Sequence, residues 1–349
     1  MDAILDQFNA AKKKYDKNID ACDDILLTVI ACLEKMSTAT SEVWPGPAGK
    51  EYLIFSSGGN QSRPFLKNQF IKTPMEFQKH WKGLLESADR DGKKFDLPAE
   101  QVSKILYITV VTFCVCIDIW KPKSRKTPGT FFEIVLGTLI SRILPTSVIR
   151  TKHISLPPNI VRDVSRVLGQ SAEDILNLVD MPYDEIGIDG ERTALTSDSV
   201  DNRKALDDEE NEQGDMQKVS TDIVFDLNGK GIVIPAKITT RERIVQPFAH
   251  QRILDGVFGE GRYISLLVCV SETQRSDEGR RVNDICVPGT ITLFQKHLAK
   301  MGGIYYLDPP ERYMALGRAG IVPIHPLGKL LTSGLSEIVK QLNSTPFVP

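Results

Sequence analysis

Long hydrophobic runs are missing from this sequence of 349 residues. No stretch reaches the roughly 18 uninterrupted apolar residues that a membrane span needs. The first residues, MDAILDQFNAAKKKYDK, also lack the basic-then-apolar order of a signal peptide. We therefore expect a cytoplasmic protein without a membrane segment.

Paired cysteines and a phosphate-binding loop are missing as well. The cysteines show neither CxxC spacing nor a His/Cys cluster suited to zinc. We expect all six to be reduced core residues: Cys22, Cys32, Cys114, Cys116, Cys269 and Cys286. The glycine pair in SSGGNQSR lacks the G-x-x-x-x-G-K pattern, which favours a surface loop over a nucleotide site.

An excess of positive charge, a common mark of nucleic-acid-binding proteins, is also missing, because the formal net charge is −2. The acids are unevenly placed, however, since the stretch from Asp198 to Asp215 holds eight acids against Arg203 and Lys204. The surrounding segment, 198–218, is polar throughout and predicts a mobile loop. The rest of the chain is net positive, which leaves DNA binding open.

Apolar segments with helical or strand periodicity are present along most of the chain. Hydrophobic residues make up 41% of the sequence, enough for a sizeable core. Residues 1–95 predict a helical N-terminal region, in which TPMEFQKHWKGLLESA is an amphipathic helix. Further on, DLPAEQVSKILYITVVTFCVCIDIW predicts a central core helix. In the next helix Thr130 stands three residues before Glu133, the spacing of a capping box, so Glu133 could be only a cap.

The segment VSTDIVFDLNGKGIVIPAKITT predicts a β-hairpin whose turn is Asn228-Gly229, because both residues tolerate positive φ. Counting outward from the turn pairs Phe225 with Ile232 and Ser220 with Lys237. Two later segments, YISLLVCVSE and GGIYYLDPPERYMALG, predict further strands of the same sheet. After the second of them, Asp308, Arg312 and Tyr313 could contact a DNA backbone, although a packed loop end is the simpler interpretation.

The hairpin register places Asp222 and Lys237 on one face as diagonal neighbours. They could form a simple surface ion pair, worth at most about 1 kcal/mol. Alternatively, Asp222 could hold a hard divalent cation such as Mg²⁺ while Lys237 positions or helps to deprotonate a water molecule. Such a pair suits hydrolysis of a phosphodiester, because both groups must meet at the scissile phosphate.

The order of Asp222, a short hairpin and the strand-ending Lys237 resembles the PD-(D/E)XK nuclease core. KITTRER resembles the version found in type II restriction endonucleases that read CCGG-, CCNGG- or CCWGG-like sites. The resemblance implies an α/β fold with a restriction-endonuclease-like mixed central sheet flanked by helices, over residues 96–349. The N-terminal region, 1–95, would then serve dimerisation or DNA wrapping.

The same resemblance implies roles for further residues. In that branch the triplet Arg241, Glu242 and Arg243 would read base edges, since guanine offers acceptors to a guanidinium and cytosine offers a donor to a carboxylate. Glu133 would be a second metal-site carboxylate from an earlier helix. Each good base contact could contribute about 1–3 kcal/mol of discrimination.

Three residues depart from the family pattern. Pro235 stands where the general motif has an acid, two residues before the lysine. The branch moves that acid to the following helix, where this chain has His250, which could be a metal ligand, a holder of a metal-bound water or a plain helix residue. Pro247 should cause a short turn followed by a kink or a fresh helix start.

Together these features predict a Mg²⁺-dependent, sequence-specific endonuclease that cuts both strands of double-stranded DNA at a G·C-containing palindrome and leaves 5′-phosphate ends. Cutting a palindrome calls for a homodimer or a higher homo-oligomer. Two alternatives stay open. One is a repair nuclease that reads DNA structure or damage, and the other is a DNA-binding protein without catalytic activity.

Overall fold

The computed structural model describes residues 1–124, 126–155, 218–227 and 229–344. Met1–Lys152 and Thr221–Pro349 form one compact unit, and His153–Ser220 form a second. The predicted loop 198–218 lies outside the described residues, except for Lys218, which begins strand β8. The division at residue 95 into an N-terminal region and a nuclease domain stays a prediction.

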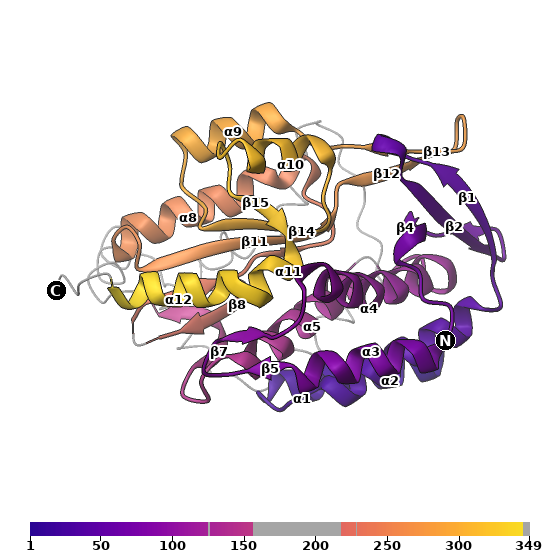
Figure 1. Ribbon diagram of the computed structural model, residues 1–349, viewed down its shortest axis with the longest axis horizontal. Coiled ribbons are helices and arrows are strands. Elements are labelled where there is room, and N and C mark those ends of the chain that lie inside the picture. The colour runs from indigo at the N-terminus through magenta and orange to yellow at the C-terminus, as the bar shows by residue number, and fades with distance from the viewer. Residues whose placement is uncertain (125, 156–217, 228, 345–349) are drawn as a thin grey trace, which may run out of the picture. The chain divides into compact units, whose positions relative to one another are not determined.

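A mixed seven-stranded sheet forms the centre of the fold, in the order β15-β14-β11-β9-β8-β7, with β10 also paired to β11 (Figure 1). β11 runs parallel to β9, β10 and β14, whereas β8 and β9 are antiparallel. The strands are β7 (Ile149–Ser155), β8 (Lys218–Asp226), β9 (Gly231–Val233), β10 (Ala236–Lys237), β11 (Tyr263–Ser271), β14 (Gly303–Asp308) and β15 (Ile324–Pro326). Both strands predicted to follow the hairpin, β11 and β14, are therefore present.

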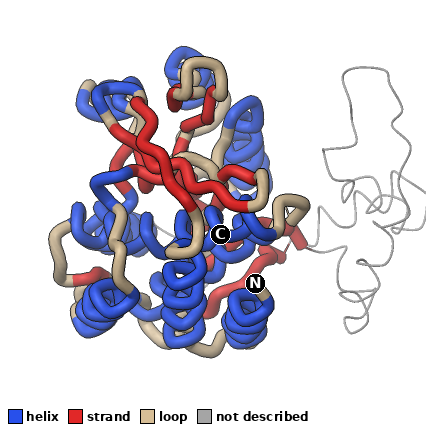
Figure 2. Tube along the Cα trace, turned by 90° about the vertical axis from the view of Figure 1, so that its right-hand side faces the viewer, coloured by secondary structure: helices blue, strands red, loops and turns tan. Residues whose placement is uncertain are grey.

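Helices cover both faces of this sheet, and the alternation along β11 explains why. Leu266, Val268 and Val270 join the hydrophobic cluster of α4, α5 and α12, whereas Leu267 and Cys269 join the cluster of α8, α9 and α10. Figure 2 shows the strands as a twisted layer between two groups of helices. The helices are α4 (Ala99–Trp120), α5 (Thr127–Ile143), α8 (Val245–Phe258), α9 (Pro288–His297), α10 (Glu311–Arg318), α11 (Leu327–Lys329) and α12 (Leu335–Ser344).

The predicted core helix is α4. It is long and apolar enough to cross a membrane by length and composition alone, but 83% of its most hydrophobic window is buried inside the protein. Cys114 and Cys116 on this helix are fully buried, and all six cysteines are free thiols. The prediction of reduced core cysteines is confirmed.

The N-terminal region contains a small sheet that the sequence did not predict. Its helices are α1 (Asp2–Asp16), α2 (Cys22–Met36) and α3 (Pro74–Glu86), and its four strands are β1 (Thr40–Pro45), β2 (Glu51–Ser57), β3 (Asn60–Gln61) and β4 (Phe65–Leu66). SSGGNQSR, predicted as a surface loop, contains the end of β2, a tight turn at Gly58 and Gly59, which both have positive φ, and the short strand β3. The apolar stripe of α3 is buried as predicted.

Helix α5 begins earlier than its predicted capping box. Thr127 is its first residue and Pro128 lies in its first turn, so Thr130 is already inside the helix. The hydroxyl of Thr130 donates to the carbonyl of Lys126 at 3.4 Å. Interpreting Glu133 as a cap is therefore wrong, and its carboxylate needs another explanation.

Candidate active site

The predicted hairpin is present and keeps its predicted register from the turn as far as Ile223 and Ile234. Phe225 pairs with Ile232, and the amide of Leu227 donates to the carbonyl of Lys230 at 2.7 Å. Gly229 has φ of 79°, which only glycine adopts without strain. The turn therefore places Asp222 where the sequence predicted it.

Beyond Ile234 the two strands separate. β9 and β10 keep one register against β11, but β10 does not pair with β8, so the predicted pairing of Ser220 with Lys237 is wrong. The amide of Ala236 instead donates to Oδ2 of Asp222 at 2.8 Å. A carboxylate thus replaces a backbone acceptor at the point where the hairpin opens.

Asp222 and Lys237 meet at this opening. Nζ of Lys237 lies 3.0 Å from Oδ2 of Asp222, and the two side chains are 34% and 33% exposed. A pair this open to solvent contributes at most about 1 kcal/mol to stability. Oδ2 of Asp222 accepts both hydrogen bonds, one from the amide of Ala236 and one from Nζ of Lys237. Oδ1 of Asp222 accepts neither of them.

Glu133 approaches the same place from α5, which packs against β10. Its side chain is only 14% exposed and lies 3.0 Å from Nζ of Lys152, an ion pair without hydrogen-bond geometry. Burial raises the pKa of Glu133, Lys152 lowers it, and the charge of Asp222 raises it. Glu133 and Asp222 are therefore close enough to sense each other's charge.

His250 on α8 lies within electrostatic reach of Asp222 and Lys237. Burial lowers the pKa of His250, while Asp222 raises it and Lys237 lowers it. Its Nε2 is buried and has no hydrogen-bond partner within the described parts of the chain. The neighbouring Gln251 points elsewhere and bonds the backbone of β11. Of the two residues, only His250 can serve the site.

Asp222, Glu133 and His250 could hold a hard divalent cation only together with oxygens from water or from the substrate. Across residues 1–124, 126–155, 218–227 and 229–344, no group of three or more His, Cys, Asp or Glu side chains converges as a complete metal cage. Mg²⁺ commonly binds through one or two carboxylates together with water and substrate phosphates. Asp222 and Glu133 can supply the carboxylates, and the unpartnered Nε2 of His250 can accept from a bound water.

Residues Arg241–Ile244, the triplet turn, form one turn of 3-10 helix directly before α8. The amide of Arg243 donates to the carbonyl of Thr240 at 2.7 Å, and the Arg243 side chain is exposed. The side chains of Arg241 and Glu242 lie outside what the structure describes. The predicted short turn at the triplet is confirmed, but α8 follows it directly from Val245, so Pro247 is the third residue of the helix and not its start.

A groove of about 460 Å³ adjoins the chain as it leaves β10. Its walls include Ile238 and Thr239 together with Arg63 and Arg275. Arg63 binds Asp118 through two parallel hydrogen bonds of 2.8 Å each, which fixes its guanidinium plane. The groove brings residues of the N-terminal region next to the candidate site.

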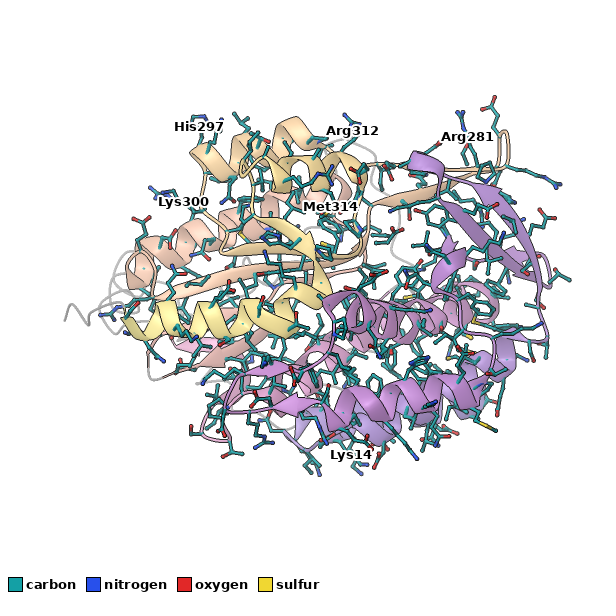
Figure 3. The ribbon with its side chains drawn as sticks, viewed as in Figure 1. Lys14, Arg281, His297, Lys300, Arg312 and Met314 are labelled. Atoms are coloured by element: carbon teal, nitrogen blue, oxygen red, sulfur yellow. The ribbon has the colours of Figure 1, made fainter. Side chains whose placement is uncertain are left out.

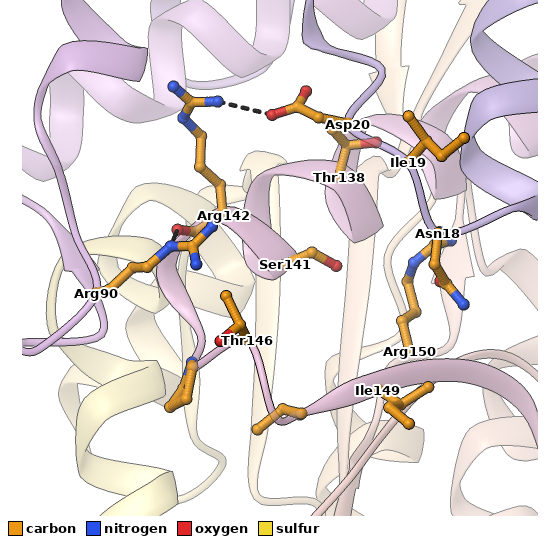
Figure 4. A pocket seen from close by; sticks show the side chains of 12 residues that line it. Asn18, Ile19, Asp20, Arg90, Thr138, Ser141, Arg142, Thr146, Ile149 and Arg150 are labelled. Atoms are coloured by element: carbon orange, nitrogen blue, oxygen red, sulfur yellow. Dashed lines mark hydrogen bonds and ion pairs between the residues drawn. The ribbon is translucent and has the colours of Figure 1, made fainter.

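A second cavity, drawn in Figure 4, contains none of the predicted site residues. Its volume is about 260 Å³, and it lies at the C-terminal end of α5. Arg142 donates to Asp20 at 2.7 Å, and Nε of Arg90 donates to the carbonyl of Arg142 at 3.0 Å. The arginine side chains at this end of α5 have a structural explanation, because their positive charge offsets the negative end of the helix dipole.

Asp308 and Tyr313 are packed parts of the fold rather than DNA contacts. Asp308 is 2% exposed and accepts from Nζ of Lys50 at 2.6 Å and from the hydroxyl of Tyr52 at 2.9 Å. The hydroxyl of Tyr313 accepts a backbone amide at 2.9 Å. Arg312 lies at the surface (Figure 3).

Two charged residues at the site were not predicted from the sequence. Lys152 pairs with Glu133 only because β7 lies beside β8, and no local pattern foretells that pairing. Glu272 is buried at the end of β11 and bonds Thr240. Its sequence signal was available, since an acid that directly follows the apolar run YISLLVCVS is as unusual as Lys237 after GIVIPA.

Known proteins include a full-length relative of this chain. No protein-family model and no curated protein matches the sequence. Among solved structures, the type IIP restriction endonuclease Kpn2I matches over 100% of both chains, with 32% sequence identity and a TM-score of 0.73. The restriction endonuclease PspGI, in a complex with substrate DNA, aligns with 78% of this chain and 92% of its own at 12% identity and a TM-score of 0.39, which is too distant to support an argument.

The mixed central sheet flanked by helices is the restriction-endonuclease fold, as the sequence predicted. This chain belongs to the type IIP restriction endonucleases. The finer assignment to a branch that reads CCGG-like sites stays a prediction.

Proposed function

We propose that this protein is a Mg²⁺-dependent endonuclease that cuts both strands of double-stranded DNA at a G·C-containing palindrome. The observation that carries the proposal is the 3.0 Å contact of Lys237 with Asp222 where the hairpin opens. The triplet turn follows four residues after Lys237. Groups suited to the phosphate and groups suited to base edges thus lie within one short segment.

Each site residue has a definable task in hydrolysis. Asp222 and Glu133 would hold a divalent cation, which would neutralise charge on the scissile phosphate and lower the pKa of a bound water. Lys237 holds the attacking water and stabilises negative charge on it. Attack in line with the O3′ leaving group gives 5′-phosphate and 3′-hydroxyl ends. Burial lowers the pKa of His250, which favours the neutral imidazole, so its Nε2 can accept a hydrogen bond from a nearby water.

The triplet turn would provide sequence reading. Arg241 and Arg243 carry forked donors that match O6 and N7 of guanine, and Glu242 carries acceptors that match N4 of cytosine. Because a palindrome presents the same half-site on both strands, we propose a homodimer with one triplet turn on each half-site. The predicted cytoplasmic location agrees with action on cellular or invading DNA.

Plasmid digestion tests the proposal directly. The protein is incubated with plasmid DNA with and without Mg²⁺, and the fragment ends are sequenced. We expect discrete 5′-phosphate ends at one G·C-containing palindrome, only when Mg²⁺ is present. Random nicking would favour a nuclease that reads DNA structure or damage. Intact DNA across several divalent metals would favour a non-catalytic binding protein.

Replacing Lys152 should move the acid limb of the pH–rate profile. Glu133 must be ionised to hold a cation, so activity falls as pH drops through its pKa. Lys152 lowers the pKa of Glu133, and Lys152→Met removes that effect. The variant should therefore lose activity at a higher pH than the wild type, as measured by kcat/KM against pH at limiting Mg²⁺.

Lys152→Arg is the matched control, because it keeps the positive charge beside Glu133. Its acid limb should coincide with that of the wild type. Saturating Mg²⁺ should narrow the difference between Lys152→Met and wild type, since the cation favours the ionised carboxylate. An acid limb that does not move in Lys152→Met would exclude Glu133 as the titrating group.

A further inference from the structure

Glu272 is a buried carboxylate whose hydrogen bonds converge on the start of the triplet turn. It directly follows β11 and is 1% exposed. Its Oε1 accepts from the amide of Thr240 at 2.9 Å, from the hydroxyl of Thr240, and from the hydroxyl of Tyr306 at 3.2 Å. A buried carboxylate is costly unless its oxygens are bonded, and here Thr240 supplies two of the donors.

Thr240 in turn fixes the triplet turn. Its amide and hydroxyl are both bound to Glu272, and its carbonyl accepts from the amide of Arg243. Thr240 is itself only 2% exposed. Each hydrogen-bonding group of Thr240 is therefore engaged, and the turn cannot rotate without breaking a bond to Glu272.

The same attachment sets the position of the turn relative to Lys237. Lys237 pairs with Cys269 on β11, and the amide of Ser271 donates to the carbonyl of Ile238 at 3.2 Å. Glu272 continues this pairing by one further residue through its side chain. The chain from Lys237 to Thr240 is thus held along β11 and its continuation.

We propose that Glu272 is a positioning residue for sequence reading. It holds Thr240 so that Arg241–Arg243 meet base edges while Lys237 meets the phosphate. The proposal rests on the function proposed above. It predicts that weakening this carboxylate relaxes discrimination between DNA sites more than it slows cleavage, because Glu272 touches neither the substrate nor Asp222.

The test compares cleavage of the cognate duplex with cleavage of duplexes that carry one changed base pair. Glu272→Gln keeps the side-chain size but weakens the acceptor. We expect its ratio of cognate to changed-site kcat/KM to fall about tenfold or more, with a smaller loss of kcat on the cognate site. Thr240→Val, which lacks the hydroxyl donor, should lower the ratio in the same way, and Thr240→Ser should keep it.

Tyr306→Phe is the control for a purely structural role. It removes another donor to the same carboxylate oxygen but leaves Thr240 bound, so it should lower the melting temperature and leave the ratio unchanged. If Glu272→Gln and Thr240→Val keep the wild-type ratio, or if Tyr306→Phe relaxes it equally, Glu272 is no positioning residue and only this proposal falls. Wild-type protein that cuts at no discrete site would overturn the proposed function, and this inference with it.

Discussion

Lys237→Met should reduce DNA cleavage by at least about a thousandfold, because the variant loses the ammonium that is paired with Asp222 at the opening of the hairpin. Methionine keeps the length and apolar stem of lysine. The pair contributes little to stability at its exposure, so the variant should fold and melt close to the wild type. Single-turnover cleavage of the cognate duplex measures the loss, and gel shifts in Ca²⁺ measure retained binding.

Lys230→Met is a matched control for this variant. Lys230 lies in the same hairpin, where its Nζ donates to the carbonyl of Leu342 at 3.0 Å. It carries the same charge but lies at the turn rather than at the opening, so cleavage should stay near the wild-type rate. Cleavage by Lys237→Met at the wild-type rate would reduce the contact of Lys237 with Asp222 to a simple ion pair and would exclude Lys237 from catalysis.

The hairpin was predictable because local rules determined it. Asn228-Gly229 fixed the turn, and the strict period of two along each strand then fixed which residues meet. The contact of Asp222 with Lys237 follows from that register even though the strands part after Ile234. A side chain can still reach across the opening when the backbones no longer pair.

Features that depend on tertiary contacts were less predictable. The capping-box spacing at Thr130 suggested a helix start, but Pro128 and the preceding loop begin α5 one turn earlier. The strands β1 to β4 were missed because glycine and proline lie between their short runs, and because β3 and β4 are only two residues long. At α5 one local signal, the proline in the first turn, prevailed over another, whereas the short strands depend on packing against the rest of the fold.

Pro235 and His250 show how a departure from a sequence pattern can be interpreted after folding. Pro235 stands where the hairpin opens, so the family's acid at that place would lie beside the carboxylate of Asp222. His250 lies within the electrostatic reach of both Asp222 and Lys237. The chain therefore keeps a polar group on α8 at this site, although a neutral imidazole binds Mg²⁺ less well than a carboxylate.

Glu133→Gln should lower cleavage by about a hundredfold or more, because an amide is a much weaker ligand for a hard cation than a carboxylate. Glutamine matches glutamate in size, so packing around the side chain should be kept. The loss should be partly relieved by raising the Mg²⁺ concentration, since the remaining carboxylate, Asp222, would bind the cation with lower affinity. Cleavage rate against Mg²⁺ concentration measures both effects.

A double variant distinguishes two roles for Glu133, that of a metal ligand and that of an ion-pair partner of Lys152. If Glu133 serves only to neutralise Lys152, the harm in Glu133→Gln comes from the ammonium left without its carboxylate 3.0 Å away. Adding Lys152→Met would then restore activity. If Glu133 holds the cation, the double variant stays as impaired as Glu133→Gln, because neither glutamine nor methionine supplies the missing charge. We expect the second result, since the charge of Asp222 raises the pKa of Glu133, an electrostatic cost that a shared divalent cation would relieve.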